Sequence, residues 1–334
     1  MNLPVAFDAP GKLMLAGEYA VLYGAKALAT ATSARLSARV EAIDGDFDEL
    51  VAPGLLDEVR SFSRQPEGEL RWRESRHEEL ALFETLLLPY VPALTARYGS
   101  ALRFSIDSRA FTRGARKLGL GSSAAVAVAL NAALAAAVEQ EQSALSAHTA
   151  FQEGEGSGTD IAIARYGGTQ CVVRECNELR TTALDWPAGL HYCVVDTGHS
   201  QSTKKMLQAL RAFEVECSNS STLIDNLCER ANESATAWQV SADDFVASLA
   251  GFRQGLQALD TASGLGLYSH GHDSLDELGV RLGVAYKPSG AGGGDIGIAF
   301  STDTAKLAEF RRQASALRFS EVKVQLACAG LTEL

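Results

Sequence analysis

The stretch KLGLGSSAAVAVALNAAL, residues 117–134, has the residue types of an anion-binding site. Glycines precede Ser122 and Ser123, and strong helix formers follow at once, so one serine is expected at the helix N-cap. The unpaired N–H groups and positive dipole end of such a helix attract phosphate, and the hydroxyls could contact phosphate or Mg²⁺. The P-loop pattern GxxxxGK[ST] is absent, and a serine-capped buried helix is the alternative interpretation.

Two further stretches carry a lysine and an aspartate that could act on a phosphate. Lys12 lies in DAPGKLMLAGEYAVLYG (8–24), where it could neutralise a phosphate or lower the pKa of an acceptor, or be a solvated surface lysine. Asp160 follows the turn in EGEGSGTDIAIARYGG (153–168) and could be a general base or orient a hydroxyl nucleophile, or be a helix N-cap. Glu153 and Glu155 could hold Mg²⁺, although solvated loop carboxylates are the simpler interpretation.

The stretch KPSGAGGGDIGIAF, residues 287–300, has four glycines in five positions. Such a run indicates unusual backbone dihedrals or a partner that approaches the backbone closely. Asp295 follows the run and opens a strand, which favours a structural or turn-capping role for it.

The elements that must position these residues alternate between strand and helix patterns. Strand patterns occur at 4–43, 102–108, 169–175, 191–198, 295–301 and 321–329, and residues 45–75 are expected to form loops with short strands at most. Helical patterns occur at 76–98, interrupted by prolines, and at 124–138, 203–216, 221–239, 242–259, 273–284 and 303–316. Strands dominate the first half and helices the second, which places a domain boundary near residues 170–200.

Composition indicates a globular protein of two domains. The chain has 334 residues, 46% of them apolar and 21% charged. Its net charge of −11 argues against broad nucleic-acid binding. The N-terminus lacks a signal-peptide pattern, and the longest apolar run, 124–138, is too short to span a bilayer. The six cysteines lack metal-ligand spacing, so reduced thiols in the cytoplasm are expected, and His191, His270 and His272 are interpreted as surface or loop residues.

Taken together, the motifs resemble those of the GHMP kinase superfamily. PGKLMLAGEYAVLYG resembles its first motif, GLGSSAAV its ATP-phosphate motif and PSGAGGGDIGIA its third motif. Within the superfamily the chain looks most like the phosphomevalonate kinases, because it has Gly17-Glu18-Tyr19 in place of GEH, Asp295 after the glycines, and the segment DTGHSQSTKKML (196–207).

The resemblance implies an α+β fold of two domains and an ATP-dependent phosphoryl transfer to a small molecule. A ribosomal S5-like domain would span residues 1–185 and a ferredoxin-like domain residues 186–334. ATP and Mg²⁺ would be bound, and the phosphate acceptor would be phosphomevalonate or mevalonate, in a cytoplasmic monomer or homodimer without nucleic-acid or membrane partners.

By position in the motifs, Asp160 matches the catalytic aspartate and Lys12 its partner, which would keep Asp160 ionised. The implied ATP-binding residues are Lys117, Gly119, Leu120, Gly121, Ser122, Ser123 and Ala124, of which Ser122 and Ser123 would also contact the metal. The implied acceptor-binding residues are Tyr19, Ser202, Thr203, Lys204, Lys205, Ser289, Gly290, Ala291 and Gly292.

One position departs from the family pattern. Mevalonate kinases place a metal-binding glutamate about eleven residues before the catalytic aspartate, and this chain has Thr149 there. Mevalonate kinase is the alternative activity, a decarboxylase of the superfamily is a weaker one, and a non-catalytic ligand-binding regulator would be expected to lack Lys12 or Asp160.

Overall fold

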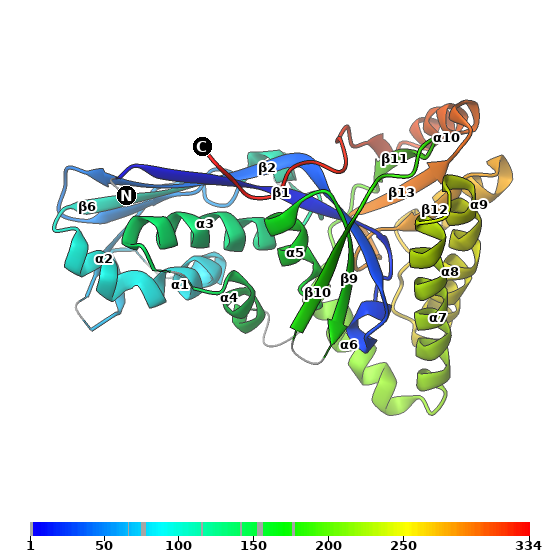
Figure 1. Cartoon of the computed structure of the whole chain (residues 1–334), viewed down its shortest axis with the longest axis horizontal. Coiled ribbons are helices and arrows are strands. Elements are labelled where there is room, and N and C mark those ends of the chain that lie inside the picture. The colour runs from blue at the N-terminus through cyan, green and yellow to red at the C-terminus, as the bar shows by residue number, and fades with distance from the viewer. Residues whose placement is uncertain are drawn as a thin grey trace.

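Two long strands at the start of the chain lie in the larger of two sheets (Figure 1). β1 (Val5–Ala16) and β2 (Ala27–Ile43) are antiparallel, and the register shifts on either side of Lys12, which lies opposite Ala31. Such shifts re-aim side chains along a strand. The structure, a computed structural model, describes residues 3–65, 67–74, 78–114, 116–140, 142–151, 156–175 and 178–334.

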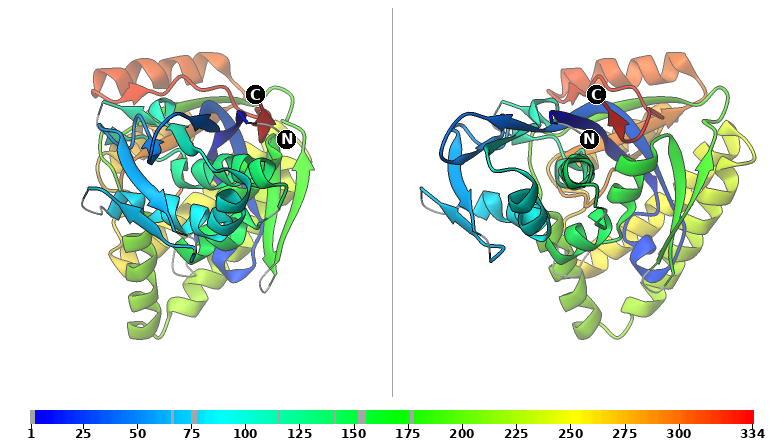
Figure 2. Two further views of the ribbon diagram at one scale, coloured as in Figure 1. Left: turned by 90° about the vertical axis from the view of Figure 1, so that its left-hand side faces the viewer. Right: turned by 60° about the vertical axis from the view of Figure 1, so that its left-hand side comes forward.

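The larger sheet has the order β10-β9-β2-β6-β3-β4-β5, with β1 paired to β2. Its other strands are β3 (Asp48–Val51), β4 (Arg60–Arg64), β5 (Leu70–Trp72), β6 (Ala101–Asp107), β9 (Thr169–Glu175) and β10 (Glu178–Leu184). β15 (Thr332–Glu333) pairs with β1, so the two chain ends lie side by side (Figures 1 and 2). The last residues of the chain therefore close the sheet in which the first residues begin.

Helices cover one face of this sheet (Figures 1 and 2). They are α1 (Ala81–Leu87), α2 (Val91–Arg97), α3 (Ser122–Val138), α4 (Ala144–Phe151) and α5 (Thr159–Tyr166), with short 3₁₀ turns at Ala20–Tyr23, Glu78–Leu80, Leu88–Tyr90 and Arg109–Phe111. α3 is the buried helix that the sequence predicts. Six of its nine alanines are buried, and small side chains let the helix lie directly on β1 and β2.

The smaller sheet comes from the second half of the chain. Its antiparallel order is β12-β13-β11-β14, formed by Ala285–Pro288, Ile296–Ser301, His191–Asp196 and Ser320–Glu321. Five helices accompany it: α6 (Thr203–Glu216), α7 (Ser220–Trp238), α8 (Ala242–Ser263), α9 (His272–Leu282) and α10 (Thr304–Ala316). All five agree with the helical patterns in the sequence, apart from shifts of a few residues at their ends.

The predicted strand at 321–329 is wrong for most of its length. Only its first residue belongs to β14, and the following residues return to the first half of the chain. There they make isolated bridges, Thr32 to Leu326 and Gly167 to Ala329. Apolar and polar residues do alternate here, but the segment pairs with the first half of the chain only through these isolated bridges. It therefore does not form a regular strand. β10, β12 and the two-stranded hairpin β7 (Thr112–Arg113) and β8 (Arg116–Lys117) were not predicted.

The α+β class is confirmed by this arrangement of helices and mixed sheets. The change from the larger to the smaller sheet falls between Leu184 and His191. The division into domains 1–185 and 186–334 stays a prediction.

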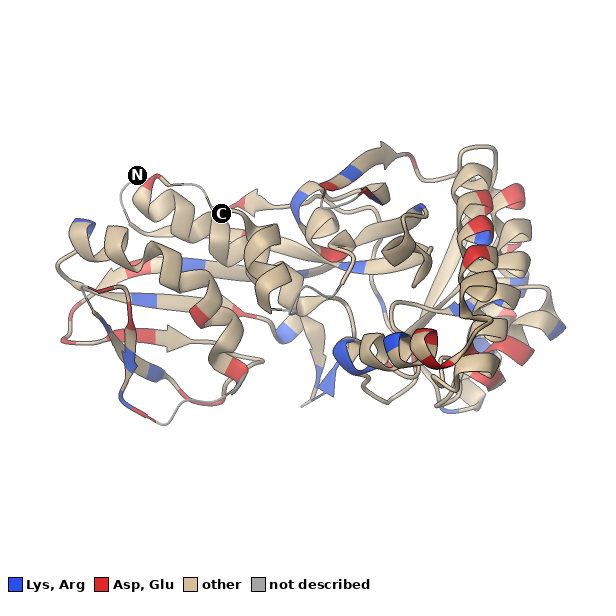
Figure 3. Cartoon of the chain, turned by 90° about the horizontal axis from the view of Figure 1, so that it is seen from below, with Lys and Arg blue, Asp and Glu red and all other residues tan. Residues whose placement is uncertain are grey.

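Charged residues of both signs are interspersed in the view of Figure 3, with a net charge of −11 for the whole chain. Among the described residues, no helix is long and apolar enough to cross a membrane.

Candidate active site

A cavity of about 770 Å³ lies where the two halves of the chain meet. Residues of the first half that line it come from β1, the turn after it, the segment 113–123 and the start of α5. Residues of the second half come from the start of α6 and the segment 289–295. The stretches that contain Lys12, GLGSS and Asp160 therefore reach the same cavity as the glycine-rich stretch 287–300.

The first glycine loop, residues 117–123, places the start of α3 at this cavity. Gly119 and Gly121 have φ values of 70° and 78°, and α3 begins at Ser122. The N-cap is Gly121 and no side chain caps the helix, so the predicted serine N-cap is wrong. A left-handed glycine turns the chain directly into the helix. Ser123 Oγ lies 3.2 Å from Nε2 of the buried His148.

Lys12 connects the first glycine loop to the second half of the chain. Its backbone N–H donates to Leu120 O at 2.8 Å. Its aliphatic chain packs on Gly121, where a Cβ would lie 3.0 Å from Lys12 Cγ, and a Cβ at Gly290 would lie 3.5 Å from its Nζ. The ammonium group therefore lies between the two glycine-rich segments, and the interpretation as a solvated surface lysine does not hold.

Asp160 also lines the cavity, as the second residue of α5. Gly158, with φ 71°, precedes the helix, and Asp160 Oδ1 accepts from the N–H of Ile161 at 3.0 Å. Although Lys12 and Asp160 are both described, no ion pair within 4.0 Å joins them in this structure. The direct pairing that the resemblance implies is therefore not formed here.

The second glycine loop, residues 287–295, is held by groups from distant parts of the chain. Gly290, Gly292 and Gly293 have φ values of 87°, 70° and 69°. Ser289 Oγ accepts from the N–H of Met14 at 3.1 Å and donates to Met14 O at 3.0 Å. The hydroxyl of Tyr19 donates to Ala291 O. These bonds attach the loop to β1 and to the turn that follows it.

An ion pair that the sequence did not reveal lies beneath this loop. Lys287 Nζ pairs with Glu18, and the two side chains are 1% and 2% exposed. Nζ also donates to Pro288 O at 2.8 Å, whereas Glu18 Oε2 has no hydrogen-bond partner among the described atoms. Burial lowers the pKa of Lys287, and the neighbouring Glu18 carboxylate opposes this shift. A lysine beside a proline in a strand gives no sequence signal of such burial.

His272 is fully buried, so its interpretation as a surface or loop residue is wrong. Its Nε2 lies 2.9 Å from Gly294 O and its Nδ1 lies 2.7 Å from the hydroxyl of Tyr286. Burial lowers the pKa of His272 to about 4, against a smaller opposing effect of the bond to Gly294. The neutral ring therefore connects α9, β12 and the end of the second glycine loop.

Asp295 lies in the cavity lining and against the first glycine loop. A Cβ at Gly119 would be 2.5 Å from Asp295 Cβ, so only glycine fits there. The backbone of Asp295 has φ 55°, and its N–H donates to His199 O at 2.6 Å. Burial raises the pKa of this carboxyl to about 6, with Lys12 and Arg116 acting in the opposite direction. The structural role expected for Asp295 holds for its backbone, but its carboxyl faces the site.

Most predicted site residues line the cavity. They are Lys12, Tyr19, Lys117, Gly119, Gly121, Ser122, Ser123, Asp160, Thr203, Ser289, Gly290 and Ala291. Six predicted residues are not part of this lining: Leu120, Ala124, Ser202, Lys204, Lys205 and Gly292. Leu120 and Ala124 are buried beneath the loop, Gly292 packs on Leu267, Ser202 is the N-cap of α6, and Lys204 is exposed.

Sequence reasoning missed several lining residues. The cations among them are Arg113 and Arg116, which lie on the hairpin leading into the first glycine loop. Their position just before GLGSS was the available signal. Glu153 and Glu155 lie outside the described residues.

The described residues contain no group of three His, Cys, Asp or Glu side chains suited to a metal ion. Oxygen donors do face the cavity from Ser122, Ser123 and Asp160. These hard ligands fit Mg²⁺ when phosphates and water supply the rest of its coordination.

Comparison with known proteins identifies the family. Residues 87–168 match the GHMP kinases N terminal domain. A phosphomevalonate kinase from Streptomyces sp. (strain CL190) is 31% identical over 338 aligned positions, which cover 87% of this chain and 88% of the relative. The chain belongs to the GHMP kinase family. This GHMP kinase is accordingly an ATP-dependent phosphotransferase that acts on a small molecule.

Solved structures share the GHMP kinase fold over nearly the whole chain. A Lin0012 protein from Listeria innocua has a TM-score of 0.85 at 24% identity and covers 99% of both chains. The phosphomevalonate kinase of Streptococcus pneumoniae, in complex with phosphomevalonate and AMPPNP, has a TM-score of 0.70 at 20% identity and covers 96% of this chain and 99% of its own. Mevalonate kinases share the fold as well.

Proposed function

We propose that this GHMP kinase transfers the γ-phosphoryl group of ATP to the phosphate of phosphomevalonate, giving ADP and diphosphomevalonate. The observation that carries the proposal is the set of four cationic side chains, Lys12, Arg113, Arg116 and Lys117, that line the cavity around the first glycine loop. Three phosphate groups of ATP and one of the acceptor would meet there, and such a site needs more positive charge than transfer to an uncharged hydroxyl group requires. The Streptomyces relative is named phosphomevalonate kinase, and this likeness supports the same substrate.

In the proposed reaction the first glycine loop binds the ATP phosphates. No side chain caps α3, and its first residues, Ser122 and Ser123, line the cavity, so the N–H groups of its first turn and the positive end of its dipole would attract the phosphates. An oxygen of the acceptor phosphate forms a bond to the γ-phosphorus while the bond to the β,γ-bridging oxygen breaks, and ADP leaves with that oxygen. The loop thus fixes the donor in line with the acceptor.

Lys12 and Asp160 would act on the transferred group and on the acceptor. Lys12, which packs on Gly121 and whose Nζ lies next to Gly290, would neutralise charge on the phosphoryl group in transit. Asp160 would orient the acceptor and take its remaining proton when the acceptor phosphate is singly protonated. Ser122 and Ser123 would hold Mg²⁺, which would supply additional positive charge to the phosphates.

The remaining assignments are part of the same proposal. Tyr19, Thr203, Ser289, Gly290 and Ala291 would surround the acceptor. Ser202, Lys204, Lys205 and Gly292 adjoin these residues in the chain but are not part of the lining. We propose that the kinase works in the cytoplasm, where ATP is available, as a monomer or homodimer.

A coupled assay for ADP release tests the acceptor. Phosphomevalonate, mevalonate, homoserine and galactose are offered in turn, and turnover with phosphomevalonate is expected. Turnover with mevalonate alone would establish the alternative activity, mevalonate kinase. ATP binding without turnover of any acceptor would favour a non-catalytic regulator.

Substitution of Asp160 tests its assignment. Asp160→Asn should lower kcat by about 100-fold or more and leave the ATP dissociation constant within about twofold, because the amide keeps the shape of the side chain and loses its charge and basicity. A fall in kcat of less than about tenfold would show that Asp160 is neither the base nor the orienting group.

A further inference from the structure

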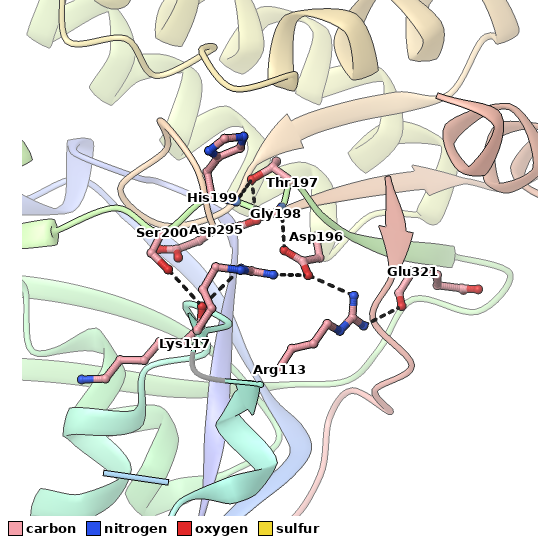
Figure 4. A network of polar contacts seen from close by, with 10 residues as sticks. Arg113, Lys117, Asp196, Thr197, Gly198, His199, Ser200, Asp295 and Glu321 are labelled. Atoms are coloured by element: carbon pink, nitrogen blue, oxygen red, sulfur yellow. Dashed lines mark hydrogen bonds and ion pairs between the residues drawn. The ribbon is translucent and has the colours of Figure 1, made fainter. Parts of the chain in front are cut away.

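A charge cluster behind the cavity joins the two halves of the chain (Figure 4). Asp196, at the end of β11, accepts from Arg113 Nη1 at 3.0 Å and from Arg116 Nη2 at 2.6 Å, both at the same oxygen, Oδ2. Its other oxygen, Oδ1, accepts from the N–H of Gly198 at 2.9 Å. One carboxylate therefore serves two guanidinium groups of the β7–β8 hairpin.

Asp196 and the two arginines differ in their access to the cavity. The Asp196 side chain is 2% exposed and is not part of the cavity lining, whereas Arg113 and Arg116 both line it and are 44% and 23% exposed. Arg113 Nη2 also donates to Glu321 O at 3.2 Å, and Arg116 Nη1 to Lys117 O at 3.4 Å. Asp196 thus holds both arginines from outside the cavity lining, while the arginines themselves belong to it.

We infer that Asp196 is a positioning residue, which draws Arg113 and Arg116 together so that they form one binding site for a phosphate or pyrophosphate group in the cavity. The cluster has two positive charges and one negative charge, so it keeps a net positive charge toward a ligand. Two guanidinium groups repel each other, and long side chains that are partly exposed would otherwise spread into solvent. Fixing them in advance lowers the entropic cost of binding an anion.

The cluster also makes this subsite depend on how the two halves of the chain are arranged. The arginines belong to the segment that leads into the first glycine loop, and Asp196 belongs to the smaller sheet. Ser200, just after Asp196, donates to Lys117 O at 3.4 Å, which adds a second contact between the same two segments. A ligand phosphate on the arginines would therefore contact a site that exists only when both halves are in place.

Asp196→Asn distinguishes positioning from simple charge. The variant keeps an oxygen for the N–H of Gly198 but offers the arginines an amide without charge. If Asp196 only neutralised the arginines, its loss would strengthen the binding of anions. If it positions them, binding weakens despite the more positive charge. The two hypotheses thus predict changes of opposite sign.

The first experiment measures the binding of inorganic pyrophosphate by titration calorimetry, without turnover. We expect the dissociation constant of Asp196→Asn to rise about tenfold, which corresponds to about 1.4 kcal/mol. Asp196→Glu, which keeps the charge at a changed distance, should show a smaller rise. Unchanged or tighter binding to Asp196→Asn would overturn the inference.

Asp48→Asn is the matched control. Asp48 is 4% exposed and pairs with Arg64 at 2.7 Å, but this ion pair lies within the larger sheet and away from the cavity lining. Its substitution should lower the melting temperature without changing the binding of pyrophosphate. An equal loss of binding in Asp48→Asn and Asp196→Asn would mean that destabilisation alone explains both, and would overturn the inference.

The kinetic form of the test rests on the proposed function. With phosphomevalonate as acceptor, Asp196→Asn should raise the KM for this acceptor about tenfold and leave kcat within about threefold, because the reacting groups are unchanged. If the wild-type kinase does not use phosphomevalonate, the proposed function fails, whereas the pyrophosphate titration still decides the role of Asp196.

Discussion

Both glycine loops line the same cavity, where Asp295 of the second packs on Gly119 of the first, but they are held in place by different means. In the first, Gly119 and Gly121 turn the chain in the left-handed region and α3 begins at the next residue. In the second, the partners are Met14, Glu18 and His272, which lie 275, 269 and 22 positions away from the loop residues that they contact. The turns of the first loop are set by its own glycines, although Lys12 N–H also donates to Leu120 O and Asp295 packs on Gly119. The second loop depends more on a buried ion pair and on hydrogen bonds to residues far away in the chain.

This difference predicts where substitutions will be costly. A locally specified loop has few buried polar partners to lose, whereas a loop held by buried charges and hydrogen bonds loses much when one partner is removed. The following predictions test that contrast, from the largest expected effect to the smallest.

The buried ion pair beneath the second glycine loop should give the largest effect. Lys287→Met leaves the Glu18 carboxylate buried without its counter-ion and should lower the free energy of unfolding by about 3–5 kcal/mol. Urea unfolding at pH 7.5 measures this loss. The double variant Glu18→Gln with Lys287→Met should recover most of it, and Lys117→Met, at the exposed lysine of the first loop, should change stability by less than about 0.5 kcal/mol. If Lys287→Met alone were as stable as the double variant, the prediction would be contradicted.

His272 should make the second loop sensitive to acid. Its pKa of about 4 in the folded chain is below the ordinary value of 6.5, so the unfolded chain binds more protons between these pH values. The stability that this group contributes is complete above about pH 6.5 and is lost as the pH falls to about 4, by about 3 kcal/mol in total. Unfolding curves of wild type and His272→Gln across this range should converge as the pH falls. Parallel curves would exclude His272 as the source.

Asp295 should have the opposite pH dependence. Its pKa of about 6 in the folded chain is above the ordinary 3.8, so the folded chain binds more protons between these values and stability falls as the pH rises. Asp295→Asn should therefore be more stable than wild type by about 2 kcal/mol at pH 7.5, after allowance for solvent screening, and nearly equal to it at pH 4. Thermal unfolding at both pH values provides the measurement. Equal stability at pH 7.5 would mean that the carboxylate is not destabilised at the site.

A pair of serines gives the smallest and most direct comparison of the loops. Ser123→Ala removes one contact, to His148, and should cost about 1 kcal/mol, while Ser289→Ala removes two bonds to Met14 and should cost about 2 kcal/mol. Both losses are measurable by urea unfolding. The reverse order would contradict the view that tertiary contacts hold the second loop more strongly.

Much of the fold could be predicted from the sequence, and the reasons are local. The five helices of the second half follow from apolar spacing and cap residues, as at Ser241, whose hydroxyl accepts from Asp244 N. The segment 321–329 was predicted wrongly, because alternation of apolar residues reports exposure of alternate side chains and does not identify the neighbouring strand. The serine N-cap was wrong because a left-handed glycine can start a helix without a cap.

Site residues were predictable where the functional residue and the residues that fix its backbone conformation belong to one short stretch. Lys12, Gly119, Ser122 and Asp160 belong to such stretches, and all of them line the cavity. Glu18, Lys287 and His272 were not predicted, because such residues are normally exposed and only a partner on another element makes their burial possible. Arg113 and Arg116 were not predicted because their ion pairs with Asp196 depend on the other half of the chain.

By itself, the sequence determined the glycine turns, the helix that follows them, the buried character of that helix and the resemblance to a kinase family. These features depend on backbone freedom and residue spacing within a few positions. Only the tertiary structure decided that Lys12 lies between two glycine loops, that Lys287 is buried against Glu18 and that Asp196 holds two arginines of the other half. Each of these depends on a distance between residues far apart in the chain, and such distances exist only once both sheets have formed.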